Sequence, residues 1–202
     1  MNEPIWTIMI PTTVDRDELY KKLVAELVAQ MAEQRLELNK DIEIVSIRDN
    51  KEISVGLKRQ QLLEMANGIW VSGFDSDDFP HPDYIHDIWN VLYTKPNIDH
   101  VGFVESCDID GQKSKSIFSI KHKSWDESET GYDHVRCANP KSVIRRTKAL
   151  QVGYKDMRWG EDRIFAEAVT PLLGSEVFIE KPLYNYIHIS TDSNERYGFD
   201  KD

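Results

Sequence analysis

The stretch Ile69–Asp78, with the sequence IWVSGFDSDD, indicates the fold better than any other part of the chain. Its first six residues form an apolar run that favours a buried strand, and its last four bring three carboxylates to the end of that strand. Carboxylates at this spacing repel one another and raise each other's pKa, so a bound Mg²⁺ or Mn²⁺ is the expected compensation. A plain solvated turn is the alternative, since Asp, Ser and Pro favour turns.

Size and composition suit a single domain. The chain has 202 residues, 40% of them hydrophobic, and a net charge of -10, which argues against a broad nucleic-acid surface. It contains no run of eighteen apolar residues, and the first residues show no signal peptide. Cys107 and Cys137 lie far apart in the sequence, which favours reduced thiols over a disulfide. We therefore expect a cytoplasmic protein.

Strands and helices alternate through the first hundred residues. Apolar runs predict strands at 5–10, 42–47, 69–74 and 101–105, and helical periodicity predicts helices at about 15–38, 57–66 and 80–92, the last opened by Pro80 and Pro82. This alternation predicts an open, mainly parallel α/β sheet, whose ligands bind beyond the carboxyl ends of the strands. Three polar segments lie at such ends and favour one shared site: Thr12-Thr13, Asp49-Asn50 and Asp75–Asp78.

The second half of the chain is less regular. Asp110-Gly111 indicates a hairpin turn before a strand at 116–120, and Asn139-Pro140 predicts the start of a helix that ends near Leu150. A further helix is expected at 160–173 and strands at 177–179 and 183–189. We expect one domain over 1–202, with a first half to about 106, a second half over about 107–192 and a loose tail at 193–202.

Seven segments follow one another in the order Ser54–Arg59, Ala66–Gly68, Asp75–Asp78, Val143–Arg146, Gly153-Tyr154, Trp159–Phe165 and Leu183–Ser190. In this order they resemble the family 2 glycosyltransferases, which have the GT-A fold. The resemblance covers about residues 5–192. Two features depart from the family pattern: Gln60 stands where an asparagine is common, and the loop Thr12–Asp15 lacks the usual small residues.

The resemblance implies a metal site at the acidic loop. It places Asp77 on a Mn²⁺ or Mg²⁺ ion and Asp75 on the ribose or a metal-bound water, with Asp78 behind them. His188 would be a third ligand or a diphosphate contact, and Arg196 would close over the diphosphate. The ion neutralises charge on the departing diphosphate. The alternatives are a helix cap for Asp78 before Pro80 and a structural role for His188.

A nucleotide pocket is implied beside the metal. Asp49 resembles the acid that accepts a hydrogen bond from a uracil-type base, and Thr12 would line the same pocket. Lys58 and Arg59 would reach the base or the phosphates as fixed cations. A turn aspartate and a plain surface lysine are the alternatives for Asp49 and Lys58.

The acceptor side is implied by Trp159–Phe165. Asp162 is the expected catalytic base, because an inverting transfer needs a carboxylate that deprotonates the acceptor hydroxyl. Glu161 would orient the acceptor or the base, and Trp159 would stack on a sugar ring. Two alternatives remain: the acids are simply favourable in the first turn of a helix, and the tryptophan belongs to the core.

These observations together predict a metal-dependent, inverting glycosyltransferase. The expected donor is a nucleoside diphosphate sugar, a UDP-sugar above others, and the expected acceptor is a hydroxyl of a glycan or, more rarely, of a modified viral DNA base. A nucleotidyltransferase is the first alternative, but it usually needs a glycine-rich phosphate loop, which Pro11–Val14 is not. The second alternative is a non-catalytic nucleotide-sugar-binding module.

Overall fold

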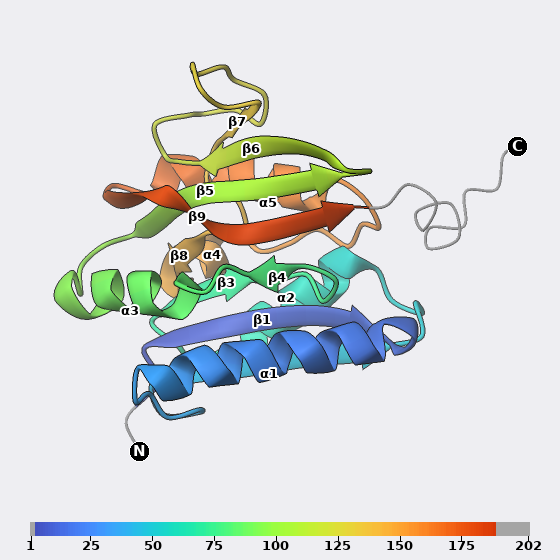
Figure 1. Ribbon diagram of the computed structural model, residues 1–202. Helices are drawn as coiled ribbons and strands as arrows, with labels where there is room; N and C mark the ends of the chain where they lie inside the picture. The colour runs from blue at the N-terminus through green and yellow to red at the C-terminus, as the bar shows by residue number, and fades with distance from the viewer. Residues whose placement is uncertain (1–2, 189–202) are drawn as a thin grey trace, which may run out of the picture.

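The computed structural model describes residues 3–188 (Figure 1), and within them a nine-stranded sheet carries helices on both faces. This confirms the predicted open α/β sheet. The strands are β1 Trp6–Thr13, β2 Ile42–Asp49, β3 Trp70–Gly73, β4 Phe79–Pro80, β5 His100–Ile109, β6 Gln112–Phe118, β7 His134–Arg136, β8 Val143–Arg145 and β9 Glu176–His188. The α-helices are α1 Asp17–Glu33, α2 Val55–Met65, α3 Tyr84–Thr94, α4 Arg146–Val152 and α5 Glu161–Val169, with short 3₁₀ turns η1 Val14–Arg16 and η2 Thr170–Leu172.

The first half of the sheet is parallel, in the order β2-β1-β3. Alternation along β1 divides the core into two layers, because successive strand residues point to opposite faces. Ile8 and Ile10 pack with Leu23 and Leu27 of α1, whereas Met9 lies in the cluster formed by α2, α4 and α5. The sheet is therefore covered on both sides, as a parallel sheet requires.

The middle of the sheet differs from the sequence prediction. The helix expected from Asn139-Pro140 begins only at Arg146, because 139–142 form a turn and β8 follows it. The Asn139 side chain caps this turn, since its Oδ1 accepts the backbone N–H of Lys141 at 2.8 Å. β-Branched Val143 and Ile144 then fill the gap between β3 and β5, where β8 pairs antiparallel with both.

The last strand is one continuous element instead of the two expected. β9 runs parallel to β5 from His100 to Ile109 and pairs antiparallel with β4. Its register shifts twice opposite Phe103–Glu105, next to Pro182. A proline inside a strand favours such a bulge because it has no N–H to donate.

Backbone angles account for the hairpin turn and for the end of the first helix. Asp110 and Gly111 have φ of 53° and 82°, as the tight hairpin between β5 and β6 requires, so the predicted hairpin is confirmed. The first helix ends earlier than expected because Arg35 and Asn39, with φ of 58° and 63°, turn the chain towards β2. Within residues 3–188, no helix is both long enough and apolar enough to span a membrane.

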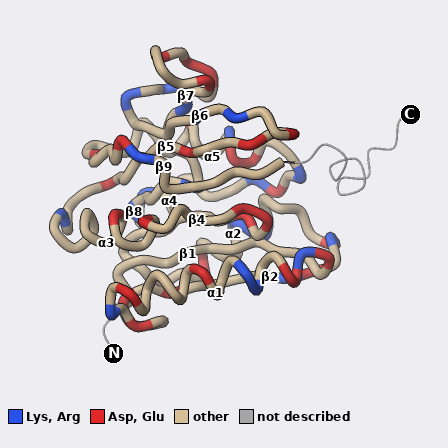
Figure 2. The backbone as a smooth tube through the Cα atoms, in the orientation of Figure 1, with Lys and Arg blue, Asp and Glu red and all other residues tan. Residues whose placement is uncertain are grey.

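Charged residues are interleaved along the chain. Figure 2 shows Lys and Arg scattered among Asp and Glu instead of gathered on one helix or strand. The cations that pair with the acidic loop between β3 and β4 accordingly come from separate segments, and they are Arg16, Arg59 and Lys141.

Gly56 allows α2 to approach the loop before α5. Its N–H donates to Met157 O at 3.1 Å, and a methyl group at Gly56 would lie 1.9 Å from the carbonyl oxygen of Lys155. The added methyl group would meet backbone atoms, which cannot rotate out of the way as a side chain can. We therefore expect Gly56→Ala to lower the free energy of unfolding by about 1–3 kcal/mol. Urea titration measures this, with Gly174→Ala as the control, since the nearest atom there is 3.5 Å away. An unchanged midpoint for Gly56→Ala would contradict the close approach.

Candidate active site

A cavity of about 710 Å³ lies beyond the carboxyl ends of β1 and β3, where the sheet topology predicts a ligand. It is lined from both halves of the chain, and ten of the twelve residues given a site role by the sequence contribute to it. Asp49 does not line it, and Arg196 lies outside the described residues. The ten are Thr12, Lys58, Arg59, Asp75, Asp77, Asp78, Trp159, Glu161, Asp162 and His188.

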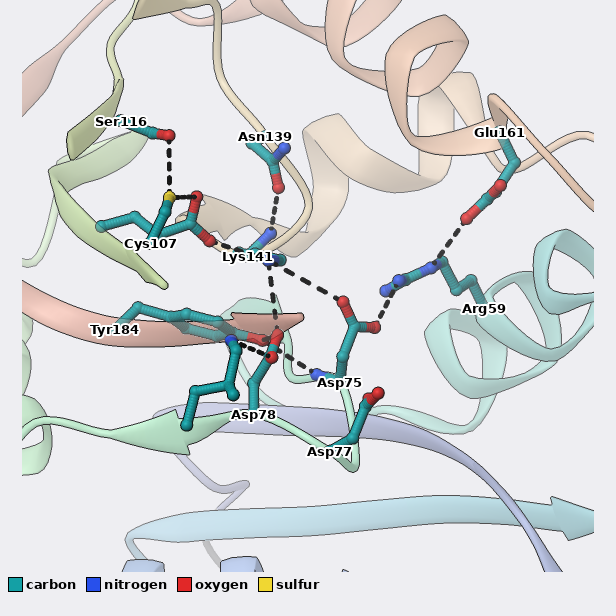
Figure 3. Close-up of polar contacts among 12 residues, drawn as sticks. Arg59, Asp75, Asp77, Asp78, Cys107, Ser116, Asn139, Lys141, Glu161 and Tyr184 are labelled. Carbon is teal, nitrogen blue, oxygen red and sulfur yellow. Dashed lines mark hydrogen bonds and ion pairs between the residues drawn. The ribbon is translucent and has the colours of Figure 1, made fainter. Parts of the chain in front are cut away.

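Backbone bonds hold the acidic loop in place. Gly73 N–H donates to Pro140 O at 2.7 Å, Phe74 N–H donates to Met9 O at 2.9 Å, and Asp78 N–H turns back to Asp75 O at 3.0 Å. In Figure 3 the three carboxylates leave this loop in different directions. The loop is thus a structured turn held by backbone hydrogen bonds.

Asp75 is joined to the first turn of α5 by Arg59. The Arg59 Nη2 lies 2.6 Å from Asp75 Oδ1, and its Nε lies 3.2 Å from Glu161 Oε1 (Figure 3). Burial alone would raise the pKa of Asp75, but Arg59, with Lys141 and Arg16, holds it below its ordinary value. Burial raises the pKa of Glu161, and Arg59 opposes that shift. Arg59, 7% exposed, therefore bridges the two predicted acidic motifs.

Lys141 is a site residue that sequence reasoning missed. Its Nζ lies 2.7 Å from Glu105 Oε1, 3.4 Å from Asp78 Oδ2 and 3.9 Å from Asp75 Oδ2. Glu105 was also missed, because it lies inside an apolar strand and its carboxylate has no motif around it. The only available signal was a lysine directly after Asn139-Pro140, which we interpreted as a helix start.

Asp78 is tied to β9 and not to a helix. Its Oδ2 accepts the Tyr184 hydroxyl at 2.7 Å, and its Oδ1 accepts the Ile187 N–H at 3.2 Å. Burial, with repulsion from Asp75 and Asp77, raises the pKa of Asp78 to about 7. The helix-cap alternative is wrong, because the residue before α3 is Asp83. Asp78 instead fastens the loop to the last strand.

Asp77 faces the cavity and lies 3.1 Å from Arg16 Nη1. Within residues 3–188, no three His, Cys, Asp or Glu side chains form a ready-made metal cage. The acids of the connected network nevertheless outnumber its cations, and oxygen donors suit a hard divalent ion. The residues present thus fit a cation that shares its coordination with a ligand's oxygens. The acids are Asp75, Asp77, Asp78, Glu105 and Glu161, and the cations are Arg16, Arg59 and Lys141.

The predicted nucleotide pocket contains a buried ion pair. Lys58 pairs with Asp49, and its Nζ also donates to Thr12 O at 2.9 Å. Lys58 is 3% exposed, so the surface-lysine alternative is wrong. Burial would raise the pKa of Asp49, but the bond from Lys58 lowers it overall. The Thr12 Oγ1 is buried with no hydrogen-bond partner, which leaves an unsatisfied donor and acceptor at the cavity wall.

The residues predicted for the acceptor side lie where α5 begins. Gly160, with φ of 76°, turns the chain into the helix, so Glu161 and Asp162 occupy its first turn. Glu161 is buried against Arg59, whereas Asp162 is only partly buried and lines the cavity. Trp159 is 52% exposed at the cavity wall, so the core alternative for it is wrong. Ser190 and Arg196 lie outside the described residues.

The solved structures with the same architecture include three of S. aureus TarS. Residues 1–349 of TarS match with a TM-score of 0.62 and 13% identity, over 91% of this chain and 60% of that one. The complex of TarS with UDP-GlcNAc matches with a TM-score of 0.61 and 12% identity, over 91% and 58%. The complex with UDP matches with a TM-score of 0.61 and 13% identity, over 95% and 62%.

The chain has a GT-A fold. The fold predicted from the sequence is thereby confirmed, and the cavity lies beyond the carboxyl ends of the strands. The chain spans about three fifths of the length of the TarS chains it matches. No family model matches the chain, and no curated protein sequence matches it.

Proposed function

We propose that this chain is a glycosyltransferase of the family 2 type. It transfers a sugar from a UDP-sugar to a hydroxyl acceptor with inversion, and it uses Mn²⁺ or Mg²⁺. The observation that carries the proposal is the single cavity that gathers the acidic loop of β3 and the first turn of α5. TarS, which has the same fold, has been solved with UDP-GlcNAc and with UDP, and this supports the donor class.

The donor end is formed mainly by the first half of the chain, and β9 adds His188 from the second half. Asp77 would hold the cation, with Asp75 and His188 beside it, and the bound cation would offset charge on the departing diphosphate. Thr12 Oγ1 would gain its missing hydrogen bond from the nucleoside. Asp49 does not line the cavity, so it would act on the base through Lys58 or after a side-chain movement.

The acceptor end is formed by α5 and the residue pair before it. The Asp162 carboxylate takes the proton of the acceptor hydroxyl while that oxygen bonds to the anomeric carbon. The bond from the anomeric carbon to the diphosphate oxygen breaks on the opposite face, and the electron pair leaves with UDP. Trp159 offers a flat apolar surface for the sugar ring. Glu161 positions α5 through Arg59 instead of contacting the acceptor.

A screen of nucleotide sugars tests the proposal, because hydrolysis of a donor needs no known acceptor. We expect UDP release from at least one UDP-sugar in Mn²⁺, abolished by EDTA. Asp77→Asn should lower this rate by about 10²-fold or more. Asp126→Asn is the control, because its side chain is 74% exposed and pairs with Arg163 on the surface.

Two results would overturn the proposal in favour of a named alternative. Pyrophosphate release from a nucleoside triphosphate would identify a nucleotidyltransferase. Tight UDP binding in a calorimeter without turnover of any donor would identify a binding module. UDP release that does not depend on a metal would support the glycosyltransferase activity and contradict the proposed role of the cation.

A further inference from the structure

Lys141 occupies an unusual position between the acids of the donor end. Its side chain is 13% exposed, and its ammonium group contacts three carboxylates from two distant segments. Two of these, Asp75 and Asp78, belong to the acidic loop (Figure 3). The third, Glu105, belongs to β5. A buried carboxylate is costly unless a cation offsets it. Lys141 supplies that cation to all three.

The ammonium group is also held by two aromatic rings. It lies 4.5 Å from the ring centre of Tyr184 and 4.4 Å from that of Tyr186, within the range of cation–π attraction. Both tyrosines come from β9 and stand on the same face of that strand. The rings and the carboxylates together leave the ammonium group little freedom to turn towards a ligand.

The turn that carries Lys141 is itself fixed. The Ser142 hydroxyl donates to Asn139 O at 2.6 Å, and His100 Nε2 lies 2.7 Å from the same hydroxyl. Pro140 O accepts the Gly73 N–H from the end of β3. Lys141 is therefore held both at its backbone and at its charged end, and its charge stays at one place in the cavity wall.

We propose that Lys141 is a positioning residue, an internal counter-ion that sets the charge of the donor end and so balances its affinity for a divalent cation against its affinity for a diphosphate. This rests on the proposed function, because it takes the two ligand classes from it. It adds that the balance depends on one lysine, with Glu105 as its opposing partner. Lys141 acts through the acids it holds and not by contact with the donor.

A charge-setting residue has a signature that a structural residue lacks. Removing the positive charge makes the donor end more negative, so a cation binds more tightly and an anion more weakly. Removing the negative charge of Glu105 does the reverse. Loss of structure would instead weaken both ligands in both variants. The two ligands and the two variants thus give four measurements with predicted signs.

The experiment uses the full chain and two probes, Mn²⁺ alone and UDP alone in EDTA. Free Mn²⁺ is measured by electron paramagnetic resonance, and UDP binding is measured by calorimetry. Lys141→Met should tighten Mn²⁺ binding and weaken UDP binding, each by about tenfold. Glu105→Gln should weaken Mn²⁺ binding and tighten UDP binding by a similar factor. Lys141→Arg should keep both dissociation constants close to those of the parent chain.

Lys181→Met is the matched control. Lys181 also pairs with two aspartates, Asp83 and Asp87, but it does not line the cavity, so neither probe should respond. Circular dichroism reports whether Lys141→Met folds. If it does not, Glu105→Gln tests the inference, because this variant should bind Mn²⁺ more weakly and UDP more tightly. If the dissociation constants of Mn²⁺ and UDP changed in the same direction in a folded variant, the role of Lys141 would be wrong, while the proposed function would stand. A parent chain that binds neither probe would overturn the proposed function and this inference together.

Discussion

Asp162→Asn is expected to lower the rate of sugar transfer by about 10²–10⁴-fold, because the amide cannot accept the proton of the acceptor hydroxyl. Asp162 is the acid of the α5 motif that is suited to this role, since it is partly exposed at the cavity while Glu161 is bound by Arg59. Binding of UDP should stay within about twofold of the parent value, because the donor end is unchanged. UDP release with donor and acceptor, or with donor alone, measures the rate.

The matched control for this variant is Glu167→Gln on the same helix. The Glu167 carboxylate bonds to Arg163 at the surface, and it does not line the cavity. Its substitution should leave the rate unchanged. Full activity of Asp162→Asn would show that another group takes the proton and that our assignment of the base is wrong.

Arg59→Met should destabilise the fold more than any other single change considered above. It leaves the buried Glu161 carboxylate and the partly buried Asp75 carboxylate without the cation that joins them. Breaking a buried ion pair in this way costs about 3–5 kcal/mol. For a domain of this size, the melting temperature should fall by roughly 10 °C. Thermal unfolding followed by circular dichroism measures the change.

Arg163→Met is the comparison, because Arg163 also pairs with two acids but its side chain is 52% exposed. Exposed pairs of this kind contribute about 0–1 kcal/mol. If Arg59→Met kept its melting temperature and lost only donor affinity, Arg59 would be a phosphate ligand, as the sequence alone suggested. A loss of stability at least several-fold larger than that of Arg163→Met supports the bridging role.

The sequence predicted the fold well where the pattern is local. The alternation around Ile69–Asp78 and the hairpin signal at Asp110-Gly111 depend on neighbouring residues, and both were confirmed. Val143 and Ile144 were placed in a helix because Asn139-Pro140 resembles a helix start. Their actual conformation depends on a gap between β3 and β5 that only the assembled sheet creates.

The candidate site was predicted in part for a similar reason. From the repulsion among the carboxylates of the acidic loop we predicted a compensating positive charge, and we expected a metal ion to supply it. The structure adds cations of the protein itself, from Arg16, Arg59 and Lys141. Lys141 was missed because its partners Glu105 and Asp78 lie 36 and 63 residues away in the sequence. No spacing rule connects residues so far apart.

The order of β9 in the chain has a consequence for biosynthesis. The acidic loop leaves the ribosome first, while Tyr184 and Ile187, which fasten Asp78, follow 106 and 109 residues later. Until then the nascent chain carries β5 without its long parallel neighbour, and contacts of such high sequence separation form slowly. Asp78 therefore gains its hydrogen bonds to β9 only after translation has passed that strand. A chain released before that point would expose the unpaired edge of β5 to chaperones.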